Sequence, residues 1–241
     1  MFKIISKNKI KKPKAIILDT DNTLYPYDLA HSASMKEVTK KAKDLIGVNE
    51  EIFLELFNLS RSEIKKKLGN TASSHSRLLY FQRTIEKLEL GTQIFLTLDL
   101  EQTYWRTFLD HSVLSDGVLN FLQKIRADGV KTANITDLTA QIQFRKMVYF
   151  GLDELFDFVV TSEEAGADKP SKLAFELVLE KLKLDVKDIW MVGDNPISDI
   201  DGGVNAGLYS IQLKTPNTSI SRNADAVFSH FDSLYKTYES L

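Results

Sequence analysis

Two carboxylates stand one residue apart directly after an apolar run near the start of the chain. Residues 15–18 read AIIL, and residues 19–23 read DTDNT. Neighbouring carboxylates repel each other unless a cation or a proton offsets their charge. Asp19 and Asp21 are therefore candidates for nucleophilic, acid/base or metal-binding chemistry. A calcium loop is the alternative, but it would follow a helix and carry Gly at its sixth position, where this chain has Leu24.

A second acidic cluster follows another apolar run, because residues 189–199 read IWMVGDNPISD. This run ends at Asp194, and Asp199 comes five residues later. Gly193 permits a close approach of the backbone to a neighbouring group. Two strand ends that both deliver carboxylates indicate a hard divalent cation bound through oxygen. Mg²⁺ suits such a partly hydrated site better than zinc does.

Two residues between these clusters are suited to anionic oxygens. Thr136 offers a hydroxyl at the end of an apolar run, and Lys169 offers an ammonium just before a predicted helix. Taken singly, such a threonine is more often a strand terminator, and such a lysine is more often a solvated surface charge. Only their order and context favour a binding role.

The elements that must position these residues alternate between strand and helix. Apolar segments rich in Ile and Val occupy residues 14–19, 131–136, 156–160, 188–193 and 208–213. Helical spacing of apolar residues is seen at 118–125, ended by Gly129, and at 173–184. This alternation predicts an α/β fold whose parallel sheet is buried on both faces. Ligands of such sheets bind beyond the carboxyl ends of the strands.

The stretch from residue 25 to residue 113 has a different character. It contains no convincing strand, and it holds three predicted helices, at residues 35–45, 49–69 and 78–88. Asn49 resembles an N-cap, since acidic residues follow it in the first turn. We therefore predict an α/β domain of residues 1–24 and 114–241, with a helical domain of residues 25–113 inserted after the first strand.

Composition excludes several classes of protein. The 241 residues are 43% hydrophobic, and 31 basic against 33 acidic side chains give a net charge of −2. We expect neither nucleic acid nor a membrane surface as a partner. Cysteine is absent, and the four scattered histidines have no metal-ligand spacing. The basic N-terminus lacks the apolar region of a signal peptide and is interpreted as a solvated tail or an edge strand. We expect a cytoplasmic protein, monomeric or weakly homo-oligomeric.

Four segments together resemble the signature motifs of the haloacid dehalogenase (HAD) superfamily. These are DxDxT at 19–23, a strand-ending threonine at 136, a lysine before a helix at 169, and GDxxxxD at 193–199. The resemblance implies a Rossmann-like core. With the five predicted strands numbered along the chain, their order in the sheet would be 5-4-1-2-3. It also implies that the helical insert is a cap domain.

The resemblance assigns the covalent chemistry to the first two acids. Asp19 would attack phosphorus and form an aspartyl-phosphate. Asp21 would protonate the leaving group and later activate water. Mg²⁺ would be held by Asp19, by the backbone carbonyl of Asp21 and by Asp194.

The remaining motif residues would bind the phosphoryl group or support it. Thr136 and Lys169 would contact phosphoryl oxygens, and Asp199 would orient Lys169 or a metal-bound water. Asp137, at a position where Asn is common in the family, would also be part of the phosphate-binding site. Thr20 likewise replaces a larger apolar residue.

Asp21 favours a phosphatase over the dehalogenases and ion-pumping ATPases of the superfamily, which lack an acid there. We predict hydrolysis of a small phosphorylated metabolite, either a nucleotide or a sugar phosphate. A phosphomutase and a non-catalytic HAD-fold binding protein are the alternatives. Residues 24–26 (LYP) resemble the pyrimidine 5'-nucleotidase branch.

Side chains of the helical insert leave the choice of substrate open. Its aromatic residues could stack on a base, although aromatics at helical spacing more often pack a core. Arg77 and Arg83 reach a second anionic group or lie on a solvated face. The aromatic candidates are Tyr25, Tyr27, Tyr80, Phe81 and Trp105.

Overall fold

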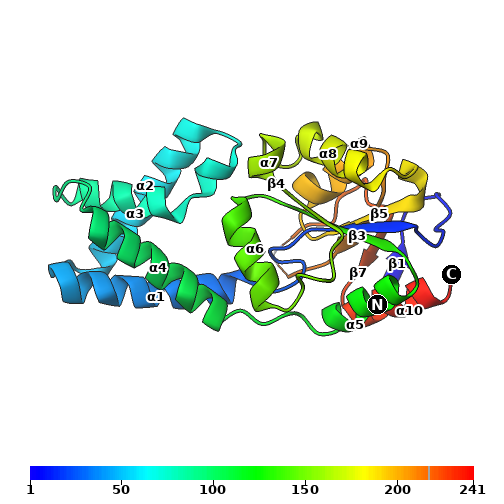
Figure 1. The fold of residues 1–241 in the computed structure, drawn as a ribbon, viewed down its shortest axis with the longest axis horizontal. Coiled ribbons are helices and arrows are strands. Elements are labelled where there is room, and N and C mark those ends of the chain that lie inside the picture. Colours follow the sequence, from blue (N-terminus) through cyan, green and yellow to red (C-terminus); the bar gives the residue numbers. More distant parts are fainter. Residues whose placement is uncertain (217) are drawn as a thin grey trace. The chain divides into compact units, whose positions relative to one another are not determined.

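The computed structural model describes residues 1–216 and 218–241 and divides them into two compact units. The first unit consists of Met1–Pro26 and Val113–Leu241, and it contains a seven-stranded sheet. The second unit, Tyr27–Ser112, is helical. Figure 1 shows the elements of both.

The sheet of the first unit has the strand order β1-β7-β6-β5-β2-β3-β4. The five strands predicted from the sequence are contiguous in the sheet, from β6 to the edge strand β4, in the predicted relative order, and all are parallel. Strand β7, which was not predicted, extends one edge, and β1 runs antiparallel to it at the N-terminus, where an edge strand was one of the two interpretations. The strands are β1 (Phe2–Ile4), β2 (Ala15–Leu18), β3 (Lys131–Thr136), β4 (Phe158–Thr161), β5 (Ile189–Gly193), β6 (Tyr209–Leu213) and β7 (Ala226–Phe228).

Helices cover both faces of this sheet, as Figure 1 shows, with α8 and α9 on one side and α5 and α10 on the other. Alternate residues of each strand therefore enter two cores. Ile17 packs in the cluster that includes Phe175 of α8, whereas Trp190 lies against Tyr238 of α10. These helices are α5 (Val118–Ala127), α6 (Ala140–Tyr149), α7 (Ser162–Ala165), α8 (Lys172–Leu182), α9 (Gly202–Asn205) and α10 (Phe231–Glu239).

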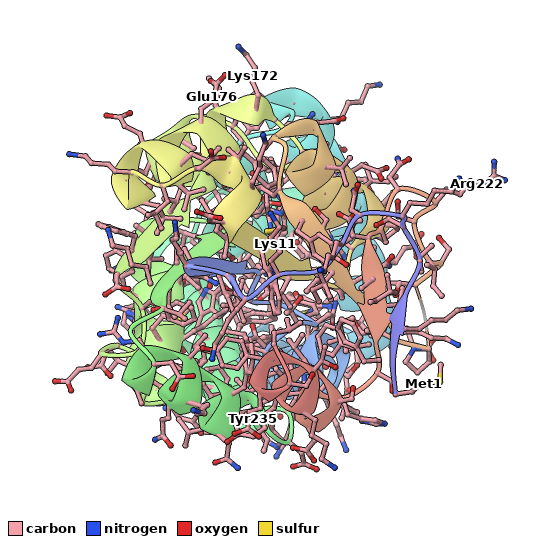
Figure 2. All side chains as sticks on the ribbon, turned by 90° about the vertical axis from the view of Figure 1, so that its right-hand side faces the viewer. Met1, Lys11, Lys172, Glu176, Arg222 and Tyr235 are labelled. Carbon is pink, nitrogen blue, oxygen red and sulfur yellow. The ribbon has the colours of Figure 1, made fainter. Side chains whose placement is uncertain are left out.

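Helix α8 illustrates the division between core and solvent. Its inner face carries Phe175 and Val178, which are buried. Lys172 and Glu176 project from the outer face, as Figure 2 shows, and form an exposed ion pair one turn apart at 3.2 Å. Such amphipathic spacing is what predicted the helix from the sequence.

The helical unit consists of four α-helices and a short 3₁₀ turn at Ala72–His75. Helix α2 begins after Asn49, whose side chain accepts the N–H groups of Glu51 and Ile52, and it ends at Gly69 as predicted. Helix α4 was not predicted. The part of the chain that the structure describes has no helix that is both long and apolar enough to cross a membrane. The four are α1 (Tyr27–Ile46), α2 (Glu50–Leu68), α3 (Arg77–Lys87) and α4 (Ile94–Asp110).

Candidate active site

Asp19 lies at the carboxyl end of the central strand β2 and is only 6% exposed. Its backbone N–H continues the sheet by donating to Val192 O at 3.0 Å. Its Oδ1 accepts from Lys169 Nζ at 2.6 Å, and its Oδ2 accepts from the Thr23 hydroxyl at 3.0 Å. Both carboxylate oxygens are therefore oriented by donors from separate segments of the chain.

The neighbouring strand β5 brings Asp194 to the same edge of the sheet. Leu18 and Val192 are paired in the parallel register, so the residues that follow them emerge together. Thr23 links the two acids, because its hydroxyl lies 3.4 Å from Asp194 Oδ1 as well as close to Asp19. The sequence prediction that two strand ends deliver carboxylates to one place is thus matched by the geometry.

Asp199 supports the site from the π-helical turn Pro196–Asp201. Its Oδ1 accepts from Lys169 Nζ at 2.7 Å, and its Oδ2 accepts from the Asn195 backbone N–H at 3.0 Å. A Cβ on Gly193 would lie 2.5 Å from this carboxylate. Gly193 is therefore required for the turn to fold back against the end of β5.

Lys169 is the cation that Asp19 and Asp199 share. Its side chain is 2% exposed, and its Nζ also donates to Ile135 O at 3.1 Å. Burial lowers the pKa of Lys169, but the carboxylates of Asp19 and Asp199 outweigh this effect and raise it well above its usual value. The ammonium therefore stays charged next to the nucleophile candidate.

The three carboxylates of Asp19, Asp194 and Asp199 outnumber the single ammonium of Lys169. Asp19, Asp194 and Asp199 are all buried, and each offers an oxygen within 4.8 Å of the others. Burial, followed by the negative charge of Asp199, raises the pKa of the Asp194 carboxyl to about 7. The same two effects raise the pKa of Asp19 well above its usual value. Hard oxygen ligands with unbalanced negative charge fit a divalent cation such as Mg²⁺.

Thr136 and Asp137 follow β3 on the other side of β2. Thr136 is buried, next to the Ile135 carbonyl that Lys169 contacts. Asp137 Oδ1 accepts the backbone N–H of Lys169 at 2.9 Å. The Asp137 carboxylate thus holds the loop that carries Lys169, and its predicted contact with a phosphate stays a prediction.

The Asp21 carboxylate accepts a hydrogen bond from a lysine other than Lys169. Its Oδ1 accepts from Lys146 Nζ at 2.7 Å and from the Tyr25 hydroxyl. The segment from Asp21 to Tyr25 forms a tight turn. The Asn22 N–H donates to Tyr25 O at 2.9 Å, and the backbone of Asn22 is left-handed with φ 64°. The Asp21 side chain is one-third exposed, so it is accessible to a ligand and fixed in direction at the same time.

Lys146 is a site residue that the sequence analysis missed. It lies on α6 among the buried residues Ile142 and Met147, and its side chain is only 1% exposed. Its Nζ is also 5.6 Å from the centroid of the Tyr25 ring. A lysine at helical spacing from apolar residues is the signal that could have revealed it, because a charge on the apolar face of a helix requires a buried partner.

Comparisons with known proteins identify the family. The family of haloacid dehalogenase-like hydrolases matches residues 13–207. Ribulose-1,5-bisphosphate 5-phosphatase of Halopiger xanaduensis is 35% identical over 82% of this chain and 83% of its own length. Pyrimidine 5'-nucleotidase YjjG of Escherichia coli is 27% identical over 82% of this chain and 84% of its own.

A solved structure supports the fold. The HAD hydrolase YfnB of Bacillus subtilis, bound to magnesium, superposes with a TM-score of 0.73. The match covers 95% of this chain and 100% of the other, at 18% identity. The motif residues, the sheet and these similarities agree, and the chain belongs to the haloacid dehalogenase-like hydrolase family.

Proposed function

We propose that this protein is a Mg²⁺-dependent phosphatase that hydrolyses a small phosphate monoester through an aspartyl-phosphate intermediate. The observation that carries the proposal is the Asp19 carboxylate, buried at the end of β2 and oriented by Lys169 and Thr23. Relatives of this chain include phosphatases that act on a sugar bisphosphate and on pyrimidine nucleotides.

In the first step, an Asp19 oxygen attacks phosphorus while the bond from phosphorus to the ester oxygen breaks. Asp21 donates a proton to the leaving oxygen, so that an alcohol departs instead of an alkoxide. In the second step, Asp21 removes a proton from water, which attacks the phosphoryl group. Inorganic phosphate leaves, and the Asp19 carboxylate is regenerated.

The phosphoryl oxygens are bound by groups at the ends of β3 and α8. Lys169 offers a positive charge whose direction is fixed by Asp199 and the Ile135 carbonyl. Thr136 offers a hydroxyl, and Asp137 keeps the Lys169 loop in place. Prearranged donors of this kind stabilise charge that develops in the transition state without reorganising.

Asp19 and Asp194 would hold Mg²⁺ together with the Asp21 carbonyl. When bound, the ion neutralises charge so that an anionic nucleophile can approach an anionic ester. Asp199 would orient Lys169, since its Oδ1 accepts from Lys169 Nζ while its Oδ2 accepts from the Asn195 backbone N–H.

Metal removal tests the proposal. We expect purified protein with Mg²⁺ to release inorganic phosphate from p-nitrophenyl phosphate, and excess EDTA to lower the rate at least about 10²-fold. Added Mg²⁺ should restore it. Activity that is indifferent to EDTA would remove the metal from the mechanism. With a sugar phosphate as the substrate, isomerised ester as the product without released phosphate would favour a phosphomutase.

Lys146 is proposed to position Asp21, since it donates to the carboxylate from a buried place on α6. We expect Lys146→Met to slow hydrolysis of an alkyl phosphate about 10-fold and that of p-nitrophenyl phosphate less, because p-nitrophenolate leaves without help from an acid. Arg145→Met is the matched control, since Arg145 is the exposed cation next to it.

A double variant separates positioning from a purely structural role. Once Asp21 is Asn, Lys146→Met should cause little further loss, because the two residues act as one unit. Losses that multiply, or equal losses for both esters, would contradict the positioning role.

A further inference from the structure

The backbone carbonyl of Asp194 accepts a hydrogen bond from a side chain of the neighbouring strand. Strand β5 ends at Gly193, which is paired with Gln212 of β6 in the parallel register. One residue further along, Gln212 Nε2 donates to Asp194 O at 3.0 Å. Buried peptide carbonyls require a partner, so the Gln212 side chain supplies one directly beyond the end of β5.

The amide of Gln212 is fully buried and takes part in three hydrogen bonds. Its Nε2 also donates to Ser219 O at 2.8 Å, and its Oε1 accepts the backbone N–H of Ser221 at 2.8 Å. A flipped amide would direct its oxygen at two carbonyl oxygens, which are acceptors as well. The orientation of the Gln212 side chain is therefore fixed by its neighbours.

The segment that Gln212 binds on its other side is bonded to the turn that carries Asp199. Ser221 Oγ donates to Asp201 Oδ1 at 2.7 Å, and Asp201 is the last residue of the π-helical turn Pro196–Asp201. Gln212 thus belongs to a chain of hydrogen bonds that connects the end of β5 with this turn. Both segments deliver a carboxylate to the candidate active site.

The carboxylate of Asp194 depends on its backbone for its direction. The Thr23 hydroxyl lies 3.4 Å from Asp194 Oδ1, which is long for a hydrogen bond between oxygens, whereas it lies 3.0 Å from Asp19 Oδ2. A side chain leaves the backbone in a direction set by the backbone torsions, and the position of the carbonyl oxygen defines one of them. A group that holds Asp194 O therefore also restricts the Asp194 carboxylate.

We propose that Gln212 is a positioning residue for the metal site, because it holds the Asp194 carbonyl and so directs the Asp194 carboxylate toward Mg²⁺. Groups that orient a metal ligand from behind typically contribute about 10–100-fold to metal affinity. This inference rests on the proposed function, in which Asp194 binds Mg²⁺. A Gln212 with a purely structural role would change the stability of the fold and leave the affinity for Mg²⁺ as it is.

Metal binding measures this role directly. We expect isothermal titration calorimetry of Gln212→Met with Mg²⁺ alone to give a dissociation constant at least about 10-fold above that of the wild type. The Mg²⁺ concentration for half-maximal hydrolysis of p-nitrophenyl phosphate should rise by a similar factor. At saturating Mg²⁺, kcat should stay within about threefold of the wild type, because Asp19, Asp21 and Lys169 keep their contacts.

Thr132→Val is the matched control for a loss of stability. Thr132 is fully buried near the amino end of β3, and its hydroxyl donates to Leu155 O at 2.6 Å. Both substitutions take the donor away from a backbone carbonyl, so both should lower the thermal midpoint. Only Gln212→Met should weaken the binding of Mg²⁺.

Gln212→Asn takes the place of Gln212→Met if the methionine variant does not fold. Its amide is one methylene shorter, so it cannot reach Asp194 O and Ser221 N–H together. We expect its dissociation constant for Mg²⁺ to rise at least about threefold, with kcat at saturating Mg²⁺ retained.

The outcomes separate the two proposals. A folded Gln212 variant that binds Mg²⁺ as tightly as the wild type would overturn the role of Gln212 and leave the phosphatase function intact. An equal loss of Mg²⁺ affinity in Thr132→Val would overturn it as well, because the effect would then follow stability. Wild-type protein that neither binds Mg²⁺ nor releases phosphate would overturn the proposed function itself and this inference with it.

Discussion

Replacing Asp19 by Asn is expected to abolish release of phosphate from every ester, with a loss of at least about 10³-fold. The amide keeps the shape of the side chain but cannot form the acyl-phosphate bond. Lys169 retains its second carboxylate partner, Asp199, at 2.7 Å, so the charge next to residue 19 stays paired. A continuous assay of phosphate release with Mg²⁺ measures the effect.

The folded state is expected to survive this substitution. Three buried carboxylates lie close together and the ammonium of Lys169 pairs with two of them, so removing one carboxylate reduces their mutual repulsion. The thermal midpoint of metal-free Asp19→Asn should therefore equal or exceed that of the wild type. Asp188→Asn, which removes an acid paired with Lys14 near the surface, is the matched control and should retain activity. A well-folded Asp19→Asn enzyme with more than about a tenth of the wild-type rate would refute covalent catalysis by Asp19.

Replacing Asp21 by Asn is expected to give a loss that depends on the leaving group. For an alkyl phosphate the loss should reach about 10²–10⁴-fold, since the departing alkoxide needs a proton. For p-nitrophenyl phosphate the first step should be affected less. The second step still lacks its base, so phosphorylated Asp19 should accumulate and the reaction should show a burst of p-nitrophenol.

Rapid quenching in acid, followed by mass measurement of the protein, detects the intermediate as an added phosphoryl group. The double variant Asp19→Asn, Asp21→Asn is the control and should acquire no such mass. A loss of equal size for both esters, without a burst, would show that Asp21 is not the acid/base and has only a structural role.

The sequence predicted the five parallel strands because each is a short, mostly apolar run that a polar residue follows directly. Strand β7 was missed, because three residues are too few to show a period. The N-terminus was left open between a solvated tail and an edge strand, because the pairing of β1 with β7 depends on contacts more than 220 residues apart. Helix α4 was missed for a different reason. Its N-cap is Gln93 in a left-handed conformation without a side-chain cap, so the usual start signal is absent.

The site residues that directly follow strands were predictable, because the sheet determines their positions. Asp19 and Asp194 follow paired strands, so their proximity results from the sheet order. Lys146 was not predictable in the same way, since its partner Asp21 is 125 residues away and is reached through the packing of α6. Thr20, an unusual residue for the family motif, donates to Asn134 on β3 at 3.1 Å. That polar pair is a tertiary contact which no local pattern shows.

The chain leaves the α/β unit after Pro26 and returns to it at Val113, which has a consequence for how this protein can evolve. The Ser115 N–H donates to Leu24 O at 2.8 Å, so the points where the helical segment leaves the α/β unit and returns to it are neighbours within that unit. An inserted segment whose ends are already closed adds little further entropy cost when its length or content changes. Replacement of the whole insert would therefore leave Asp19 and its partners untouched. The length and content of the helical segment can therefore change independently of the residues around Asp19.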